Sequence, residues 1–274
     1  MADDVVPEGV DPTRLSPARL YDYYLGGTHN FEIDRQAAEQ IRARMPELAD
    51  AAWANRGFHG RAAVWMADQH GIRQFIDIGS GLPTQNNTHQ AVGKVAPDAR
   101  VVYVDMDPMV AAYGSALLAG DGSTALVTAD LREPETVLEN PLLRALIDFS
   151  QPVGVLLTAV MHFIADSSDP WGLVRRYMGA MPPGSYLALS HVTYDNLPPQ
   201  VAAMGQQVYE QATSNVHART HAEVTRFFDG LELVSPYAGA QPALTFVGLW
   251  GAEDVAAADS DGSRVSYCGV ARRP

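Results

Sequence analysis

The feature that most constrains the fold is an apolar run, 75–78, that contains an acid and leads into two glycines one residue apart. A buried parallel strand typically ends in this way beside a nucleotide-type ligand. Gly79 and Gly81 let the backbone turn tightly and approach a ligand where a Cβ would collide. The next apolar run, 100–105, ends in Asp105, whose carboxylate can accept hydrogen bonds from both hydroxyls of a ribose. The two segments predict the first half of a nucleoside-binding α/β domain.

The residues around this turn discriminate between nucleoside ligands. Dinucleotide folds have a third glycine where this chain has Thr84, and they place the ribose acid about 20 residues after the turn, closer than Asp105 lies to Asp77. Between Arg73 and Lys94 there is no basic residue to meet a phosphate. S-adenosylmethionine has a ribose, an adenine and a methionine part but no phosphate, and an acid suits its ammonium and sulfonium. We therefore expect S-adenosylmethionine, with NAD(P), a phosphate-free nucleotide or an empty fold as alternatives.

Composition excludes several classes of protein. The chain has 274 residues, 47% hydrophobic and 19% charged, which suits one globular domain or a domain with a smaller appendage. A net charge of −13 disfavours nucleic acids and anionic membranes as partners. Cys268 is the only cysteine, so no intramolecular disulfide or cysteine-based metal cluster is expected, and a cytoplasmic location fits. We identify no signal pattern and no membrane span.

Strand and helix patterns alternate along the chain. Ser16 and Pro17 match a helix N-cap and its first residue, and Thr220 with Glu223 matches a capping box. The alternation predicts a parallel, doubly wound sheet, with the last two strands able to pair as an antiparallel hairpin. The expected strands are 74–78, 100–105, 124–130, 152–158, 185–191, 231–236 and 265–271. The expected helices are 17–25, 34–44, 49–70, 84–95, 108–119, 134–147, 170–181, 198–213 and 221–228.

Several segments resemble a known family. From about Arg14 to Pro274 the chain resembles S-adenosylmethionine-dependent methyltransferases formerly classed as a domain of unknown function. The resemblance rests on ARLYDYYLGGTHNF at 18–31, Asp34-Arg35, Asn55-Arg56, FIDIGSGLPT at 75–84, VDMDP at 104–108, TADLR at 128–132, FDGLEL at 228–233 and YCGVAR at 267–272. After Pro236 the chain has Tyr-Ala-Gly where the family favours Gly-Leu, a departure that affects one loop.

The resemblance implies a fold and a division of the chain. The fold is α/β, a Rossmann-like class I methyltransferase with a mostly parallel seven-stranded sheet, helices on both faces and an N-terminal helical cap. We expect a flexible N-terminus over 1–13, the helical cap over 14–70 and the S-adenosylmethionine-binding methyltransferase domain over 71–274.

Candidate cofactor-binding residues gather at the ends of the predicted strands. The glycine turn would hold the methionine part and the ribose edge, Asp105 the ribose and Met106 the adenine face, although Met106 would equally suit core packing. Asp130, after the third strand, would accept a hydrogen bond from the adenine amino group, and the backbone N–H of Leu131 would meet a ring nitrogen. The alternative role for Asp130 is helix capping. Two residues after the fourth strand would lie in the crevice. These candidates are Asp77, Gly79, Ser80, Gly81, Asp105, Met106, Asp130, Leu131, Thr158 and Ala159.

The N-terminal signature supplies further candidates. Tyr21, Tyr24 and Asn30 surround the Gly26-Gly27 pair, a combination that suits a mobile lid over a ligand, although simple docking of the helix on the sheet would also explain it. Arg56 could bind the ligand carboxylate through two parallel hydrogen bonds, or form a surface ion pair.

The catalytic residue is predicted less directly. His162 follows the fourth strand and is our candidate, with His191 and Tyr194 as alternatives for a general base. Methyl transfer is an in-line displacement that depends mostly on positioning, so a dedicated base is not obligatory. His217 and His221 have a metal-binding spacing, but no third ligand is evident, and we expect no metal.

The sequence thus predicts an enzyme, an S-adenosylmethionine-dependent methyltransferase acting on an oxygen or nitrogen nucleophile of a small molecule. The alternative is a catalytically idle S-adenosylmethionine-binding protein that serves as a sensor or partner subunit. For its assembly we keep a homodimer open.

Overall fold

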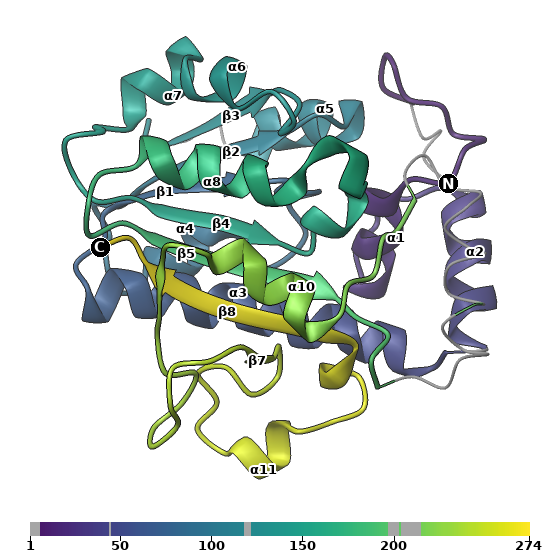
Figure 1. Ribbon diagram of the computed structural model, residues 1–274. Coiled ribbons are helices and arrows are strands. Elements are labelled where there is room, and N and C mark those ends of the chain that lie inside the picture. The colour runs from purple at the N-terminus through teal and green to yellow at the C-terminus, as the bar shows by residue number, and fades with distance from the viewer. Residues whose placement is uncertain (1–5, 44, 118–121, 197–202, 204–214) are drawn as a thin grey trace.

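An eight-stranded sheet forms the centre of the computed structural model, which describes residues 6–43, 45–117, 122–196, 203 and 215–274 (Figure 1). The strand order is β3-β2-β1-β4-β5-β8-β6, with β7 also paired to β8. The strands are β1 Gln74–Ile78, β2 Arg100–Asp105, β3 Thr124–Thr128, β4 Gly154–Thr158, β5 Tyr186–Val192, β6 Glu232–Leu233, β7 Thr245–Phe246 and β8 Ser266–Arg272.

The pairing confirms the predicted α/β sheet. Strands β1 to β5 pair in parallel, and β8 runs antiparallel to β5, β6 and β7. The expected antiparallel pairing of the last two predicted strands is therefore confirmed. The predicted count of seven was wrong by one, because β7 is a two-residue strand too short to leave a period in the sequence.

Helices cover both faces of the sheet. One face packs against α3 and α4, and the other packs against α6, α7, α8 and α10 (Figure 1). The helices are α1 Pro17–Tyr24, α2 Glu32–Arg42, α3 Glu47–Gln69, α4 Thr88–Val92, α5 Pro108–Leu117, α6 Pro134–Leu138, α7 Pro141–Leu146, α8 Pro170–Ala180, α10 His221–Thr225 and α11 Val255–Ala258. Single 3₁₀ turns lie at η1 Met161–Phe163, η2 Asp166–Ser168, η3 Arg226–Phe228 and η4 Ser263–Val265.

Side-chain alternation along β1 decides what each of its residues can reach. Successive residues of a strand point to opposite faces. Phe75 packs in the cluster beneath α3, whereas Ile76 and Ile78 pack in the cluster on the other face. Asp77 has the same parity as Phe75, so its carboxyl group points toward α3 and α4.

Three predicted boundaries needed correction. The helix predicted at 84–95 is only α4, because Pro83 and the left-handed Asn86 (φ 48°) keep the preceding loop irregular. The helix predicted at 134–147 is broken into two, because Pro141 starts α7 and has no N–H to continue α6. The strand predicted at 231–236 shortens to β6. The helix predicted at 198–213 falls almost wholly outside the described residues.

The N-terminal helices lie at the end of the sheet toward which the parallel strands point (Figure 1). Ser16 caps α1 and Pro17 is its first residue, as predicted. The two helices α1 and α2 pack around Leu20, Ala38 and Ile41, and α3 continues beneath the sheet. Among the described helices, none combines the length and apolar character that crossing a bilayer requires.

Candidate functional site

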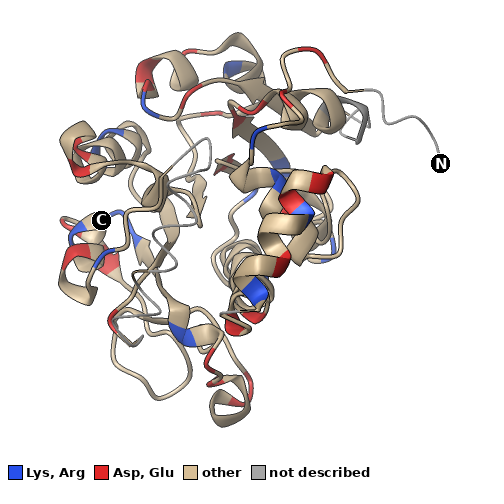
Figure 2. Ribbon diagram, turned by 90° about the vertical axis from the view of Figure 1, so that its right-hand side faces the viewer, with Lys and Arg blue, Asp and Glu red and all other residues tan. Residues whose placement is uncertain are grey.

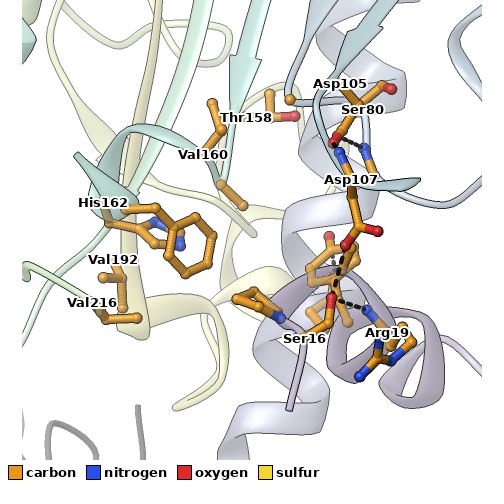
Figure 3. A pocket seen from close by; sticks show the side chains of 18 of the residues that line it. Ser16, Arg19, Ser80, Asp105, Asp107, Thr158, Val160, His162, Val192 and Val216 are labelled. Carbon is orange, nitrogen blue, oxygen red and sulfur yellow. Dashed lines mark hydrogen bonds between the residues drawn. The ribbon is translucent and has the colours of Figure 1, made fainter. Parts of the chain in front are cut away.

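A cavity of about 630 Å³ lies between the N-terminal segment and the carboxyl ends of the parallel strands. Ligands of open α/β sheets bind at these ends, and the volume is in the range of small-molecule sites. Figure 3 shows two contrasting sides. One side carries the polar residues Ser80, Asp105 and Asp107, and the other carries His162 and Val192.

Most of the predicted site residues line this cavity, and two do not. Those that line it are Tyr21, Tyr24, Arg56, Gly79, Ser80, Gly81, Asp105, Met106, Asp130, Leu131, Thr158, Ala159 and His162. Asp77 and Asn30 lie outside its lining, for the reasons given below.

The glycine turn is shaped by two different constraints. Gly79 and Gly81 have positive φ angles of 70° and 66°, which side chains with a Cβ adopt only with strain. A Cβ on Gly79 would lie 2.2 Å from Val160 Cγ2. Gly79 therefore allows the turn to pack closely against the loop that follows β4. A Cβ on Gly81 would meet no protein atom within 4 Å. Gly81 therefore leaves free space on a wall of the cavity.

Asp105 connects the turn to the end of β2. Its two carboxylate oxygens accept hydrogen bonds from the backbone N–H groups of Gly81, at 2.8 Å, and Asp107, at 2.9 Å. Burial raises the pKa of Asp105 to about 6 despite these bonds. Asp107 in turn accepts a bond from the Ser16 hydroxyl at 2.9 Å, which fastens α1 beside the strand end. Each Asp105 oxygen keeps lone-pair capacity for a ligand hydroxyl.

The residues predicted at the adenine lie nearby. Met106 is 56% exposed, so the core-packing alternative does not describe it. Asp130 forms an ion pair with Arg132 at 2.5 Å, and this partner lowers the pKa of Asp130. The Leu131 carbonyl accepts a bond from Tyr177, while its backbone N–H remains a candidate donor at the cavity wall.

Arg56 is a buried cation on the cavity wall. It has 8% of its surface exposed, and its Nε has no hydrogen-bond partner among the described residues. No ion pair with it is found in the described part of the chain, so the surface-pair alternative does not apply. Its guanidinium lies 5.8 Å from the centre of the Tyr21 ring. A buried unpaired charge is costly unless a ligand of opposite charge compensates it.

Asp77 does not face the cavity because the strand turns its carboxyl group toward α3 and α4. It accepts a 2.6 Å bond from the Thr88 hydroxyl, and the same hydroxyl lies 2.7 Å from His59 Nε2. His59 Nδ1 lies 2.9 Å from the hydroxyl of Thr158, which lines the cavity. The direct ligand contact predicted for Asp77 is therefore replaced by an indirect connection through three side chains.

The Gly26-Gly27 segment is held in place by Asp22. This buried carboxylate accepts bonds from the Asn30 side chain at 2.8 Å and from the Thr84 hydroxyl at 2.7 Å. A Cβ on Gly27 would lie 2.0 Å from the carboxylate, so Gly27 provides a close fit there. Asn30 thus orders the loop behind the cavity wall.

The two tyrosines contribute to the wall itself. Tyr21 and Tyr24 line the cavity, while their hydroxyls donate to the carbonyls of Ala52 and Ala38 on the neighbouring helices. Asn55 donates a further bond to the Tyr21 hydroxyl at 2.9 Å.

The structure separates the three candidates for a base. His191 does not line the cavity, and both of its nitrogens are engaged, Nδ1 with the Val192 carbonyl and Nε2 with Arg219. His162 and Tyr194 do line it. The Nδ1 atom of His162 is buried without a partner among the described residues. Burial, with the nearby Arg219 charge, lowers the pKa of His162 to about 3, so its ring is neutral at physiological pH.

Sequence reasoning missed several residues that shape the site. His59 joins Thr88 to Thr158, and Asn55 accepts a 2.5 Å bond from Ser190 beneath the Ala159 loop. The available signal was a polar cluster, Asn55, Arg56 and His59, within an alanine-rich helix. His59 is four residues after Asn55 and three after Arg56, spacings at which helix side chains are neighbours.

Known proteins of one family resemble this chain over nearly its whole length. A model of the S-adenosyl methyltransferase family matches residues 3–274. A DUF574 family protein of known structure from Streptomyces avermitilis is 39% identical, with 96% of this chain and 99% of that chain covered and a TM-score of 0.89. A proposed methyltransferase from Thermobifida fusca is 38% identical, with coverages of 98% and 99% and a TM-score of 0.89. No curated protein matches the chain.

The cavity itself fits the cofactor of that family. It offers a buried strand-end carboxylate to a ribose, the uncompensated Arg56 cation to a carboxylate and the free space beside Gly81. Since the family match spans nearly the whole chain and the site suits its cofactor, the chain belongs to the family of S-adenosyl methyltransferases, with S-adenosylmethionine as its cofactor.

Proposed function

We propose that the chain transfers the methyl group of S-adenosylmethionine to an oxygen or nitrogen nucleophile of a small molecule. The observation that carries this proposal is the second, largely apolar side of the cavity, which extends beyond the polar strand ends. That side includes Ile164, Val192 and Val216 together with His162. A protein that merely held the cofactor would have no need of a further lined space beside it.

The polar side would hold the cofactor. Asp105 would accept bonds from the ribose hydroxyls, with Met106 against the adenine and Leu131 and Asp130 at its edge. Arg56 would bind the carboxylate of the methionine part. When bound, the cofactor supplies an electrophilic methyl group on a sulfonium. The protein's own contribution is to bind, orient and exclude water.

The apolar side would hold the acceptor. Among the described residues around η1 and the end of β5 that line it, none is charged at neutral pH, and the polar groups there are His162, Tyr194 and Ser266. A charged acceptor would lose its hydration in this region without gaining a partner. The acceptor we propose is therefore uncharged and largely apolar, with one protic O–H or N–H group.

His162 would orient that group. A neutral imidazole offers one nitrogen lone pair, which can accept a hydrogen bond from the acceptor's O–H or N–H. With a pKa of about 3 it is a weak base. Its main effect would thus be alignment of the nucleophile, together with uptake of the proton as the new bond to carbon forms.

The charge distribution supports a small molecule over a nucleic acid. The chain has 19 basic and 32 acidic residues. Figure 2 shows the basic residues dispersed among acidic ones instead of gathered in one band. This dispersion among the residues drawn there argues against the clustered basic patch that phosphate backbones require.

A single-turnover assay tests the proposal. The protein is mixed with one equivalent of S-adenosylmethionine and a panel of neutral phenols, neutral heterocyclic N–H compounds, carboxylates and protonated amines. Formation of S-adenosylhomocysteine and of methylated product is then followed by mass spectrometry. We expect transfer confined to neutral protic acceptors. Preferred methylation of a protein or an RNA added to the same mixture would contradict the proposal.

A further inference from the structure

A buried hydrogen-bonded chain connects the cavity to a carboxylate that does not touch it. We name it the relay, and its members in order are Asp77, Thr88, His59 and Thr158. The three successive contacts measure 2.6, 2.7 and 2.9 Å. Asp77, Thr88 and His59 have at most 3% of their surface exposed, so water does not offer them alternative partners.

The direction of each bond in the relay follows from proton counting. An ionised carboxylate only accepts, so the single hydroxyl proton of Thr88 goes to Asp77. Thr88 must then accept from His59, which places the imidazole proton on Nε2. Burial and the Arg56 charge lower the pKa of His59 to about 3, so the ring is neutral and Nδ1 carries a lone pair. That lone pair accepts the hydroxyl proton of Thr158. The lone pairs of the Thr158 oxygen therefore remain free to accept a hydrogen bond from a ligand in the cavity.

We propose that the relay turns the Thr158 hydroxyl into an obligate acceptor that binds the ammonium group of the cofactor's methionine part. This inference rests on the proposed placement of the cofactor, with its carboxylate on Arg56. Arg56 and His59 are three residues apart on α3, a spacing at which side chains are neighbours. Since His59 holds Thr158, the cation and the hydroxyl belong to one region of the wall. The carboxylate and ammonium groups of an amino acid share one carbon and would meet both.

The relay also predicts that the direction of each of its hydrogen bonds reverses at low pH. Protonated Asp77 would donate to Thr88, Thr88 would donate to His59 Nε2, and His59 would carry its proton on Nδ1. The Thr158 hydroxyl would then point its own proton into the cavity and repel an ammonium. The reversal would centre near pH 6, because desolvation raises the pKa of Asp77 to about 6.

Other charged and titratable groups around Asp77 act on this midpoint. Arg56 and His59 face it from α3, and the Arg56 charge opposes the rise in the pKa of Asp77. On β2, burial first and the Asp77 charge second raise the pKa of Tyr103, so its hydroxyl stays neutral. On β4 the paired residue is Leu156, and from α4 the contact is Thr88.

Two ligands separate the relay from the rest of the site. S-adenosylhomocysteine carries the amino-acid end, and 5′-methylthioadenosine lacks it but keeps the ribose and adenine. Both would respond equally to titration of Asp105, so the ratio of their affinities isolates the amino-acid end. The ratio is measured by calorimetry from pH 8 to pH 5 in the wild type, Thr88→Val and Thr88→Ser.

For the wild type we expect the preference for S-adenosylhomocysteine to fall roughly ten-fold or more from pH 8 to pH 5, the value of one charge-assisted hydrogen bond. Thr88→Val should have a weaker preference for S-adenosylhomocysteine over 5′-methylthioadenosine at pH 8, and this preference should no longer change with pH. Thr88→Ser keeps the hydroxyl and should restore the wild-type profile. Thr158→Val should abolish the pH-dependent part without touching the buried carboxylate.

A second readout is independent of ligand binding. Nitrogen-15 NMR of histidine-labelled protein, with the His59 signals assigned from His59→Gln, should show the proton on Nε2 at pH 8 and on Nδ1 at pH 5. A proton on Nδ1 at pH 8, or an affinity ratio that does not change with pH in the wild type, would overturn the relay while leaving cofactor binding intact. Failure of both ligands to bind the wild type would overturn the cofactor placement as well.

Discussion

Replacement of Asp105 by alanine tests the ribose contact, and its effect can be worked out from the structure. The carboxylate would make charge-assisted bonds to ribose hydroxyls, whose loss costs about 1.5–3 kcal/mol. This corresponds to roughly a 10- to 150-fold loss of affinity for S-adenosylhomocysteine at pH 8. Calorimetry measures it directly.

The same substitution has two opposing effects on folding. It leaves the N–H groups of Gly81 and Asp107 without their acceptor, which lowers the free energy of unfolding by about 1–3 kcal/mol for each group that water does not reach. It also removes a carboxyl group whose pKa is raised from 3.8 to about 6, a penalty of about 3 kcal/mol at neutral pH. Because the folded-state pKa is raised, the stabilising effect of Asp105 is complete below about pH 4 and is lost as the pH rises through 6. Asp105→Ala should therefore lower the melting temperature more at pH 4 than at pH 8.

The control is Asp98→Ala, which removes a carboxylate that precedes the opposite end of β2. Asp98 has an exposed side chain paired with Arg73, and its loss should leave the affinity for S-adenosylhomocysteine unchanged. Unchanged affinity of a well-folded Asp105→Ala protein would refute the reasoning and remove Asp105 from the ligand site.

Three further predictions follow from the site. Arg56→Met should weaken S-adenosylhomocysteine about ten-fold or more by calorimetry but leave 5′-methylthioadenosine unaffected, and equal losses for both ligands would argue against a carboxylate contact. His162→Gln should slow single-turnover methyl transfer roughly 10- to 100-fold with unchanged S-adenosylhomocysteine affinity, and an unchanged rate would exclude the residue from the reaction. Gly79→Ala should lower the free energy of unfolding in urea by about 3 kcal/mol, because its Cβ would clash with Val160. Gly81→Ala should lower it by only about 1 kcal/mol, yet weaken cofactor binding. A larger loss of stability for Gly81→Ala than for Gly79→Ala would contradict the structure.

Local patterns made the frame of the fold predictable. The runs at 74–78 and 100–105 coincide with β1 and β2, because an apolar strand that stops at a glycine turn or an acid is marked by its own residues. The capping box at Thr220 and Glu223 also forms as predicted. The mobile lid expected around the Gly26-Gly27 pair stays a prediction. In the structure, Ser16 at the start of α1 is hydrogen-bonded to Asp107 beside the end of β2.

Contacts between residues far apart in the chain could not be predicted from the sequence. The contact of His59 with Thr158 joins residues 99 positions apart, and no local pattern announces it. The predicted ligand contact of Asp77 depended on which face of β1 it occupies, and only the pairing with α3 and α4 decides that. The same limit applies to His191, whose Nε2 is engaged by Arg219, a residue 28 positions further along the chain.

A crystal structure with bound S-adenosylhomocysteine tests the central claim most directly. The account predicts the ribose hydroxyls on the Asp105 carboxylate, the ligand carboxylate on Arg56, the ammonium at Thr158 and the sulfur facing the side of the cavity that carries His162. A ligand bound elsewhere, or one in this cavity that leaves Asp105 and Arg56 without contacts, would contradict it.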